Sequence, residues 1–181
     1  MVYVFLASGF EEIEALATVD ILRRANIEVQ TVGVGGKNIT GTHNITVHTD
    51  ITEAETKTDN LLGVVLPGGL PGAWNLRDSK RVRELTDYCF SKGLLVSAIC
   101  AAPAVLGRWG MLRDKNAVCY PGFEEELIGA KYNDFSVVRD GSIITGKGAG
   151  AVFEFAFEIV SYLTSSNEKS KKIGDAMQCN H

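Results

Sequence analysis

The run of apolar and small residues at 94–99 most constrains what this chain can fold into. Such a run is typical of a strand buried on both faces, as in a parallel sheet covered by helices on each side. Similar runs occupy 2–7 and 61–66. A helical pattern at 11–25 followed by an apolar strand at 28–34 predicts a β-α-β unit with a right-handed crossover. We therefore expect a doubly wound α/β fold.

Shorter sequence patterns predict the remaining elements of the chain. Alternating Thr, Val and Ile at 39–52 predict a β-excursion, and Ser79 is a candidate N-cap for a helix that ends near residue 91. The Asp140-Gly141 pair predicts a hairpin between strands at 135–139 and 142–145. We also expect helices at 104–109 and 152–163, a brief strand at 117–120, a helical turn at 123–128 and a last helix after 165. The absence of repeats and linkers predicts one domain over residues 1–181.

The helix expected at 11–25 has an apolar stripe, which we predict to face the sheet. The stripe consists of Ile13, Leu16, Ala17, Ile21 and Leu22. Glu11, Glu12 and Glu14 crowd the first turn, where the helix dipole favours negative charge. Capping is the simplest interpretation of these three acids.

Composition excludes several classes of function. A net charge of −4 and a pI near 5.4 argue against a nucleic-acid or anionic-membrane partner. No apolar run reaches the roughly 20 residues of a membrane span, and residues 1–6 resemble a first strand more than a signal peptide. The four cysteines form no CxxC pair. We expect reduced thiols and a cytoplasmic location.

Cys100 directly follows the strand at 94–99, at a turn into a helical stretch. Free N–H groups and the helix dipole at such a turn stabilise a thiolate. Small side chains at Ala98, Ala101 and Ala102 leave room for a ligand to reach the sulfur. The alternative is a buried structural cysteine, the commoner fate of a free Cys. Cys89, on the apolar face of the helix after Ser79, is predicted to belong to the core.

Three loops are expected to converge at the carboxyl ends of the strands, where open α/β sheets bind ligands. They contain residues 8–14, 67–69 and 100–101. A glutamate of the first loop can hydrogen-bond the sulfur, and the N–H groups of Gly69 and Ala101 can cradle an oxyanion. Each feature taken alone is also explained as a helix cap or a tight turn.

The chain lacks a suitably placed histidine after Cys100, which argues against a Cys-His hydrolase. His43 and His48 would point to opposite faces of an extended segment, so they are no metal pair. His181 is the terminal residue, and we expect it to be disordered. The segment 146–150 fits neither phosphate-loop pattern, so Lys147 is expected to lean over a site or to pair with an acid. We expect no metal and no cofactor.

Four segments together resemble the DJ-1/ThiJ/PfpI superfamily, on its DJ-1-like branch. They are Gly9-Phe10-Glu11-Glu12-Ile13-Glu14-Ala15, Val65-Leu66-Pro67-Gly68-Gly69, Ala98-Ile99-Cys100-Ala101-Ala102-Pro103, and Gly148-Ala149-Gly150 with Phe153-Glu154-Phe155. The resemblance implies a flavodoxin-like three-layer sandwich with a mostly parallel central sheet, similar to class I glutamine amidotransferases. It also implies a homodimer and a reactive cysteine on a nucleophile elbow.

The resemblance assigns Cys100 as the nucleophile and Glu14 as the protonated carboxyl beside it. Its oxyanion- and substrate-binding set maps to Gly68, Gly69, Ala101, His43, Tyr120 and Ala149. The chain departs from the family at several of these positions. Ala101 stands where the protease-like branch has a His, which argues against peptidase activity, and His43 replaces an Arg expected near the cysteine across the dimer.

Two further departures affect catalysis. Tyr120 precedes Pro121 where members with glyoxalase or deglycase activity carry a His, and a Tyr, with its reference pKa of about 10, is a poor base at neutral pH. Ala149 replaces the proline of a Gly-Pro-Gly loop.

Three hypotheses follow. The first is a cofactor-independent glyoxalase or deglycase that acts on small 2-oxoaldehydes or early glycation adducts. The second is a cysteine redox sensor or chaperone without turnover. Both require that Glu14 stay protonated, with a raised pKa. In the third, Cys100 is inert and the protein only binds a partner. A thiamine-biosynthesis role has no support in these residues.

Overall fold

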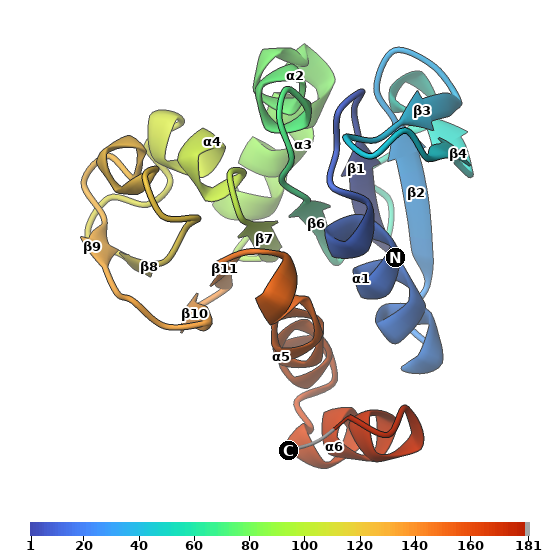
Figure 1. The fold of residues 1–181 in the computed structure, drawn as a ribbon, viewed down its shortest axis with the longest axis vertical. Coiled ribbons are helices and arrows are strands. Elements are labelled where there is room, and N and C mark those ends of the chain that lie inside the picture. Colours follow the sequence, from blue (N-terminus) through green and yellow to red (C-terminus); the bar gives the residue numbers. More distant parts are fainter. Residues whose placement is uncertain (180–181) are drawn as a thin grey trace.

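The structure is a computed structural model that describes residues 1–179 (Figure 1). His181 lies outside the described residues. The central sheet has seven strands: β1 (Val2–Leu6), β2 (Val29–Gly33), β5 (Ile51–Thr52), β6 (Gly63–Leu66), β7 (Leu95–Ile99), β10 (Val137–Asp140) and β11 (Ile143–Gly146). Their order is β10-β11-β7-β6-β1-β2-β5, and each neighbouring pair is parallel except β10 and β11.

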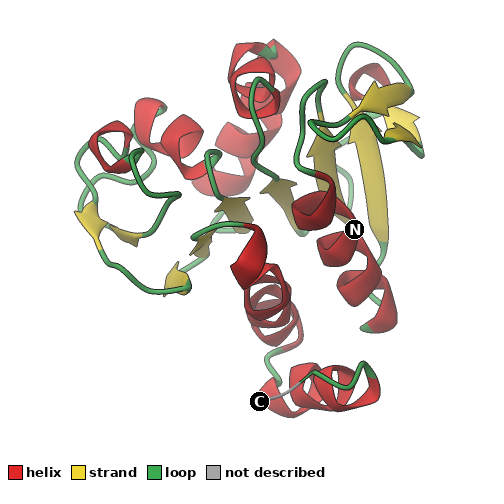
Figure 2. Ribbon diagram, viewed as in Figure 1, coloured by secondary structure: helices red, strands yellow, loops and turns green. Residues whose placement is uncertain are grey.

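Helices cover both faces of this sheet (Figure 2). One layer contains α1 (Glu12–Arg24), α5 (Val152–Thr164) and α6 (Asn167–Ala176), and the other contains α2 (Gly72–Asp78), α3 (Lys80–Ser91) and α4 (Pro103–Arg108). Two small pairs lie outside the sheet: β3 (Asn38–Thr40) with β4 (Thr46–His48), and β8 (Asn116–Ala117) with β9 (Lys131–Tyr132). Single 3-10 turns occupy Glu53–Glu55, Glu124–Glu126 and Ala149–Ala151. The expected α/β sandwich is thereby confirmed.

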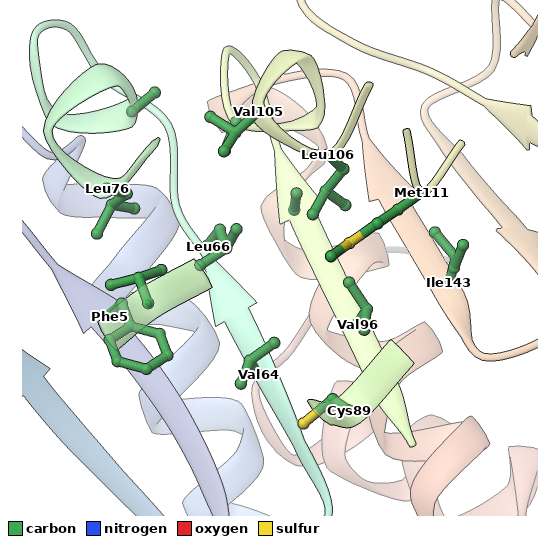
Figure 3. Packing of buried hydrophobic residues seen from close by; sticks show 14 of the residues in the cluster. Phe5, Val64, Leu66, Leu76, Cys89, Val96, Val105, Leu106, Met111 and Ile143 are labelled. Carbon is green, nitrogen blue, oxygen red and sulfur yellow. The ribbon is translucent and has the colours of Figure 1, made fainter. Parts of the chain in front are cut away.

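The two cores explain why the strands are apolar without alternation. Successive strand side chains point to opposite faces, so Val64 and Leu66 pack into one core and Val65 into the other. Figure 3 shows the first core, which contains Val64 and Leu66 of β6 together with Leu76 of α2. The second core contains Phe155 of α5. Because burying one such side chain contributes roughly 1.5–3 kcal/mol, both helical layers stabilise the same strands.

Helix α1 differs from the prediction in which side chains it buries. Ile13 is 56% exposed and Leu16 is 37% exposed, whereas Glu12 and Glu14 face inward. The stripe is buried at Ile21 and Leu22, whereas near the helix start the two glutamates point inward in place of Ile13 and Leu16. Both glutamates instead accept backbone N–H groups from other loops: Glu14 from Gly68 at 2.8 Å and Glu12 from His43 at 2.7 Å. These hydrogen bonds offset part of the cost of burying the two carboxyl groups.

Other local predictions have mixed outcomes. The Ser79 cap is confirmed, since its Oγ accepts from the Val82 N–H at 3.2 Å, and Cys89 lies in the core. The 140–141 turn joins β10 and β11 as expected. Helix α2 was not predicted, because its Pro71-Gly72 start has the composition of a turn. The strand expected at 117–120 is only the two-residue β8. Among the helices of residues 1–179, none has both the length and the hydrophobicity needed to cross a membrane.

Candidate functional site

The loops after β1 and β6 are joined backbone to backbone. The Glu11 N–H donates to the Gly68 carbonyl at 3.0 Å, and the Gly72 N–H donates to the Gly9 carbonyl at 3.2 Å. A Cβ on Gly72 would lie 2.6 Å from the Gly9 carbonyl carbon, so this approach needs a residue without a side chain. Sequence analysis singled out neither Gly9 nor Gly72 for this contact. The only indication of this contact in the sequence is that each of the two turns ends in a glycine.

Cys100 occupies a sharp bend immediately after β7. Its φ is +64°, a region that residues with a side chain rarely adopt. Neighbouring segments hold it there: its N–H donates to the Gly146 carbonyl at 2.9 Å, and its carbonyl accepts the Tyr120 N–H at 2.8 Å. Strain of this kind costs about 1–3 kcal/mol and is typical of functional sites.

Gly68 lets the thiol of Cys100 and the carboxyl of Glu14 share one space. A Cβ on Gly68 would lie 2.7 Å from the Cβ of Cys100 and 2.8 Å from Oε2 of Glu14. The Gly68 N–H donates to that same Oε2, while Oε1 of Glu14 is buried and has no hydrogen-bond partner among the described residues. The Gly68 N–H therefore holds Oε2 by a hydrogen bond, and Oε1 is the carboxyl oxygen that can carry a proton.

The two groups titrate as a pair. Burial raises the pKa of Glu14 to about 7, against the opposing effects of the Gly68 N–H and Cys100. Burial and the Glu14 carboxylate raise the pKa of the Cys100 thiol to about 12, against the N–H groups of Gly69 and Ala101. The pair therefore carries one negative charge over the range between these values. That charge lies on the carboxylate or on the sulfur, depending on which group holds the shared proton.

The N–H groups that favour a thiolate come from Gly69 and Ala101. They belong to two different loops, and helix α4 itself has only six residues. Of the two sources of stabilisation expected at this turn, free N–H groups and a helix dipole, the N–H groups of Gly69 and Ala101 are the ones that lower the thiol pKa. A pair of converging N–H donors is also the arrangement that binds an oxyanion.

His43 lies in the loop between β3 and β4 and contacts Glu12. Its Nδ1 is 2.9 Å from Oε2 of Glu12 and 3.9 Å from Oε1 of Glu11, and its side chain is 68% exposed. The hydrogen bond with Glu12 raises the pKa of His43. Ligand atoms of these three residues lie within 4.8 Å of one another, a spacing that a metal ion could bridge. Because Glu12 already accepts the His43 N–H, the cluster is explained as the anchor of this loop.

Tyr120 and Ala149 line a shared pocket of about 470 Å³. Its wall includes Lys147, whose ammonium lies 2.6 Å from Oδ1 of Asp134, so Lys147 pairs with an acid. The backbone N–H of Tyr120 donates to the Cys100 carbonyl at 2.8 Å, but neither Cys100 nor Glu14 is among the residues that line the pocket. The structure thus groups Cys100, Glu14, Gly68, Gly69 and Ala101. It bonds the Tyr120 backbone to Cys100, places Ala149 with Tyr120 at the pocket, and puts His43 on Glu12.

Two other cysteines provide a contrast with Cys100. Cys89 and Cys119 are fully buried, and burial raises the pKa of each thiol to about 12. Cys100 has a comparable pKa but is partly exposed, and it alone of these three has a carboxyl that shares its proton.

Comparisons with known proteins find one matching family and several similar chains. The profile of the DJ-1/PfpI family matches residues 1–162. Protein dj-1beta of Drosophila melanogaster is 36% identical over 177 residues, which cover 96% of this chain and 94% of that protein. A Pyrococcus abyssi protein named a deglycase is 30% identical, with coverage of 90% and 98%. The structure of Toxoplasma gondii DJ-1, described as oxidized, has a TM-score of 0.95 and 30% identity, covering 99% of this chain and 98% of that one.

Proposed function

Because this chain belongs to the DJ-1/PfpI family, we propose that it is a cysteine-dependent stress protein acting on small 2-oxoaldehydes or early glycation adducts. The observation that carries the proposal is the buried Glu14 carboxyl, with its pKa near 7, beside the thiol of Cys100. Such a carboxyl gives and takes a proton at neutral pH, as a general acid–base must. The name of the Pyrococcus abyssi relative supports the same class of chemistry.

The proposed reaction needs only the shared proton and the oxyanion donors. The thiol proton moves to Glu14 as the sulfur attacks the aldehyde carbon, and the N–H groups of Gly69 and Ala101 stabilise the developing oxyanion. Glu14 returns this proton to the oxyanion, which gives a hemithioacetal and leaves Glu14 as a carboxylate. Glu14 then moves a proton from the former aldehyde carbon to its neighbour through an enediol, which leaves a 2-hydroxy thioester. Water hydrolyses this thioester to a 2-hydroxy acid and restores the thiol.

Lactate formation from methylglyoxal tests this proposal. We expect the Cys100→Ala variant to lose at least about 100-fold in rate, because covalent catalysis requires the sulfur. Cys89→Ala is the matched control, since that thiol is buried in the core and its loss should leave the rate per folded molecule unchanged. Equal rates for wild type and Cys100→Ala would remove Cys100 from the mechanism.

The same thiol also supports a second candidate function, that of a peroxide sensor. Two N–H donors and a protonated Glu14 would stabilise an oxidised sulfur, and the solved Toxoplasma gondii relative is described as oxidized. Intact-mass analysis after mild peroxide treatment distinguishes the two. Two added oxygens on Cys100 with negligible aldehyde turnover would favour the sensor, whereas overoxidation spread equally over Cys179 would argue against it.

We further propose that the protein forms a homodimer through the outer face of α1. Ile13 and Leu16 of that helix are exposed, as are Ile45 of the β3–β4 loop and Phe153 at the start of the adjacent α5. A second copy would cover these apolar side chains. Sedimentation should then give twice the 19.6 kDa chain mass. The four free cysteines support a reducing compartment such as the cytoplasm.

A further inference from the structure

The three acids at the start of α1 each bond a different partner. Glu12 accepts the His43 N–H and so anchors the β3–β4 loop. Glu14 accepts the Gly68 N–H. Glu11 is the helix N-cap, and its Oε2 accepts the Glu14 N–H at 2.7 Å. Glu11 is therefore the acid whose side chain bonds directly to the backbone of Glu14.

Three hydrogen bonds close a ring through Glu11, Gly68 and Glu14. The Glu11 N–H donates to the Gly68 carbonyl at 3.0 Å, and the Gly68 N–H donates to Oε2 of Glu14 at 2.8 Å. The Glu14 N–H donates to Oε2 of Glu11 and completes the ring. The ring thus holds Glu14 at its backbone and at one carboxyl oxygen, which limits the directions in which the carboxyl can point.

The surroundings of Glu11 make both its hydrogen bond and its charge effective. A Cβ on Gly69 would lie 2.5 Å from the Glu11 nitrogen, so the two loops are in close contact there. The Glu11 side chain is only 13% exposed, so water screens its charge weakly. That charge raises the pKa of Glu14, in addition to the larger effect of burial. Cys100 is the other titratable group that acts on Glu14, and His43 faces Glu11, with Nδ1 3.9 Å from Oε1.

We propose that Glu11 is the positioning residue of the Glu14–Cys100 pair: its hydrogen bond keeps the Glu14 carboxyl at the sulfur, and its charge keeps that carboxyl protonated to a higher pH. The proposal rests on the function proposed above and adds a residue that takes no part in the covalent steps. Two substitutions separate the two effects. Glu11→Gln keeps a side-chain oxygen that can accept the Glu14 N–H but removes the charge, whereas Glu11→Ala removes both.

Alkylation of Cys100 by iodoacetamide as a function of pH tests both effects without turnover. The wild-type rate should stop rising near the pKa of Glu14, because above it the pair keeps a constant share of thiolate. In Glu11→Gln this levelling should move to lower pH, because the missing charge no longer raises the pKa of Glu14. In Glu11→Ala the rate should keep rising above about pH 7, because a carboxyl that is not held at the sulfur no longer shares the thiol proton.

Turnover provides the second measurement. Lactate formation from methylglyoxal should fall at least about tenfold in Glu11→Ala, because a misplacement of about 1 Å can cost about 100-fold in rate. Glu11→Gln should recover most of this loss. Ser166→Ala is the matched control, because Ser166 caps α6 by accepting the Lys169 N–H at 3.2 Å. It removes the same kind of helix cap from a helix that contributes no residue to the site, so the alkylation curve and the rate per folded molecule should stay as in wild type.

A wild-type alkylation curve in Glu11→Ala would overturn the assignment, and so would an unchanged levelling pH in Glu11→Gln. A curve altered equally by Ser166→Ala would also overturn it, because a general loss of stability would then explain the effect. If wild type made no lactate while Glu11→Gln still shifted the levelling to lower pH, the proposed enzymatic function would fail and the role of Glu11 would be supported.

Discussion

Replacing Glu14 with glutamine should raise the free energy of unfolding by about 3 kcal/mol at pH 8 and by almost nothing at pH 4. Burial raises the pKa of Glu14 from 4.5 to about 7 in the folded protein. Below pH 4.5 the carboxyl is neutral in the folded and the unfolded state, so its burial does not lower the free energy of unfolding. As the pH rises to 7, the unfolded chain ionises first, and the folded state loses stability until its own carboxyl ionises. A glutamine carries no charge at any pH, so it removes this loss.

Urea unfolding at pH 4, 6 and 8 measures the effect. The advantage of Glu14→Gln should grow from the first pH to the last. Glu125→Gln is the matched control, because Glu125 is exposed and its neutralisation should change stability by less than about 0.5 kcal/mol. A stability difference that did not vary with pH would show that the folded-state pKa of Glu14 is normal.

The same variant should separate nucleophile formation from proton transfer. Below pH 7 the Glu14 carboxyl is protonated, so wild type and Glu14→Gln should form thiolate in similar proportion. Above pH 7 the wild-type pair already holds its single negative charge, so alkylation of Cys100 by iodoacetamide should level off. The variant should keep gaining thiolate, about tenfold per pH unit. It should nevertheless make no lactate, because the carboxylate that moves the second proton is absent.

Parallel alkylation curves for both proteins up to pH 9 would contradict this coupling. Cys89 and Cys119 serve as internal references in the same peptide maps, because both are buried and have no carboxyl that shares their proton in this way. Their modification should follow global unfolding, whereas that of Cys100 should not.

Replacing Gly69 with alanine should destabilise the protein by about 4 kcal/mol or more, among the largest effects of a single substitution. Gly69 has a φ of +83°, and its Cβ would lie 2.5 Å from the Glu11 nitrogen and the Gly9 carbonyl oxygen. These are backbone atoms that no side-chain rotation can move. The loop carrying an oxyanion donor would have to separate from the loop that leads into α1.

Gly35→Ala is the matched control for this substitution. Gly35 has nearly the same φ, +85°, but no atom of the described residues lies within 4 Å of its added Cβ. The Gly35→Ala variant should therefore be destabilised only by the cost of the left-handed backbone conformation, about 1 kcal/mol. Urea unfolding of both variants compares the two costs. Equal losses would mean that the contact between the two loops adds nothing to stability.

Much of the fold could be predicted because apolar runs and turn residues act locally. The runs at 61–66 and 94–99 predicted doubly buried strands, and both became central strands of the sheet. The helix N-cap at Ser79 could be predicted for the same reason, because its hydroxyl accepts a hydrogen bond from an N–H only three residues later. Helix α2 escaped prediction because its start at Pro71-Gly72 has the composition of a turn, while the core that buries its Ala73 and Leu76 is formed by residues distant in sequence.

The sequence by itself determined the parallel sheet, the bend at Cys100 and the loops that meet there, because hydrophobic periodicity and parallel pairing decide where strands end. Only the tertiary structure decided that Glu14 is buried while Ile13 is exposed, and that the pair of Glu14 and Cys100 shares one proton. The physical reason is that desolvation and hydrogen bonding act through space. The Gly68 N–H that holds Glu14 is distant in sequence, and a pKa follows from surroundings that no local pattern records.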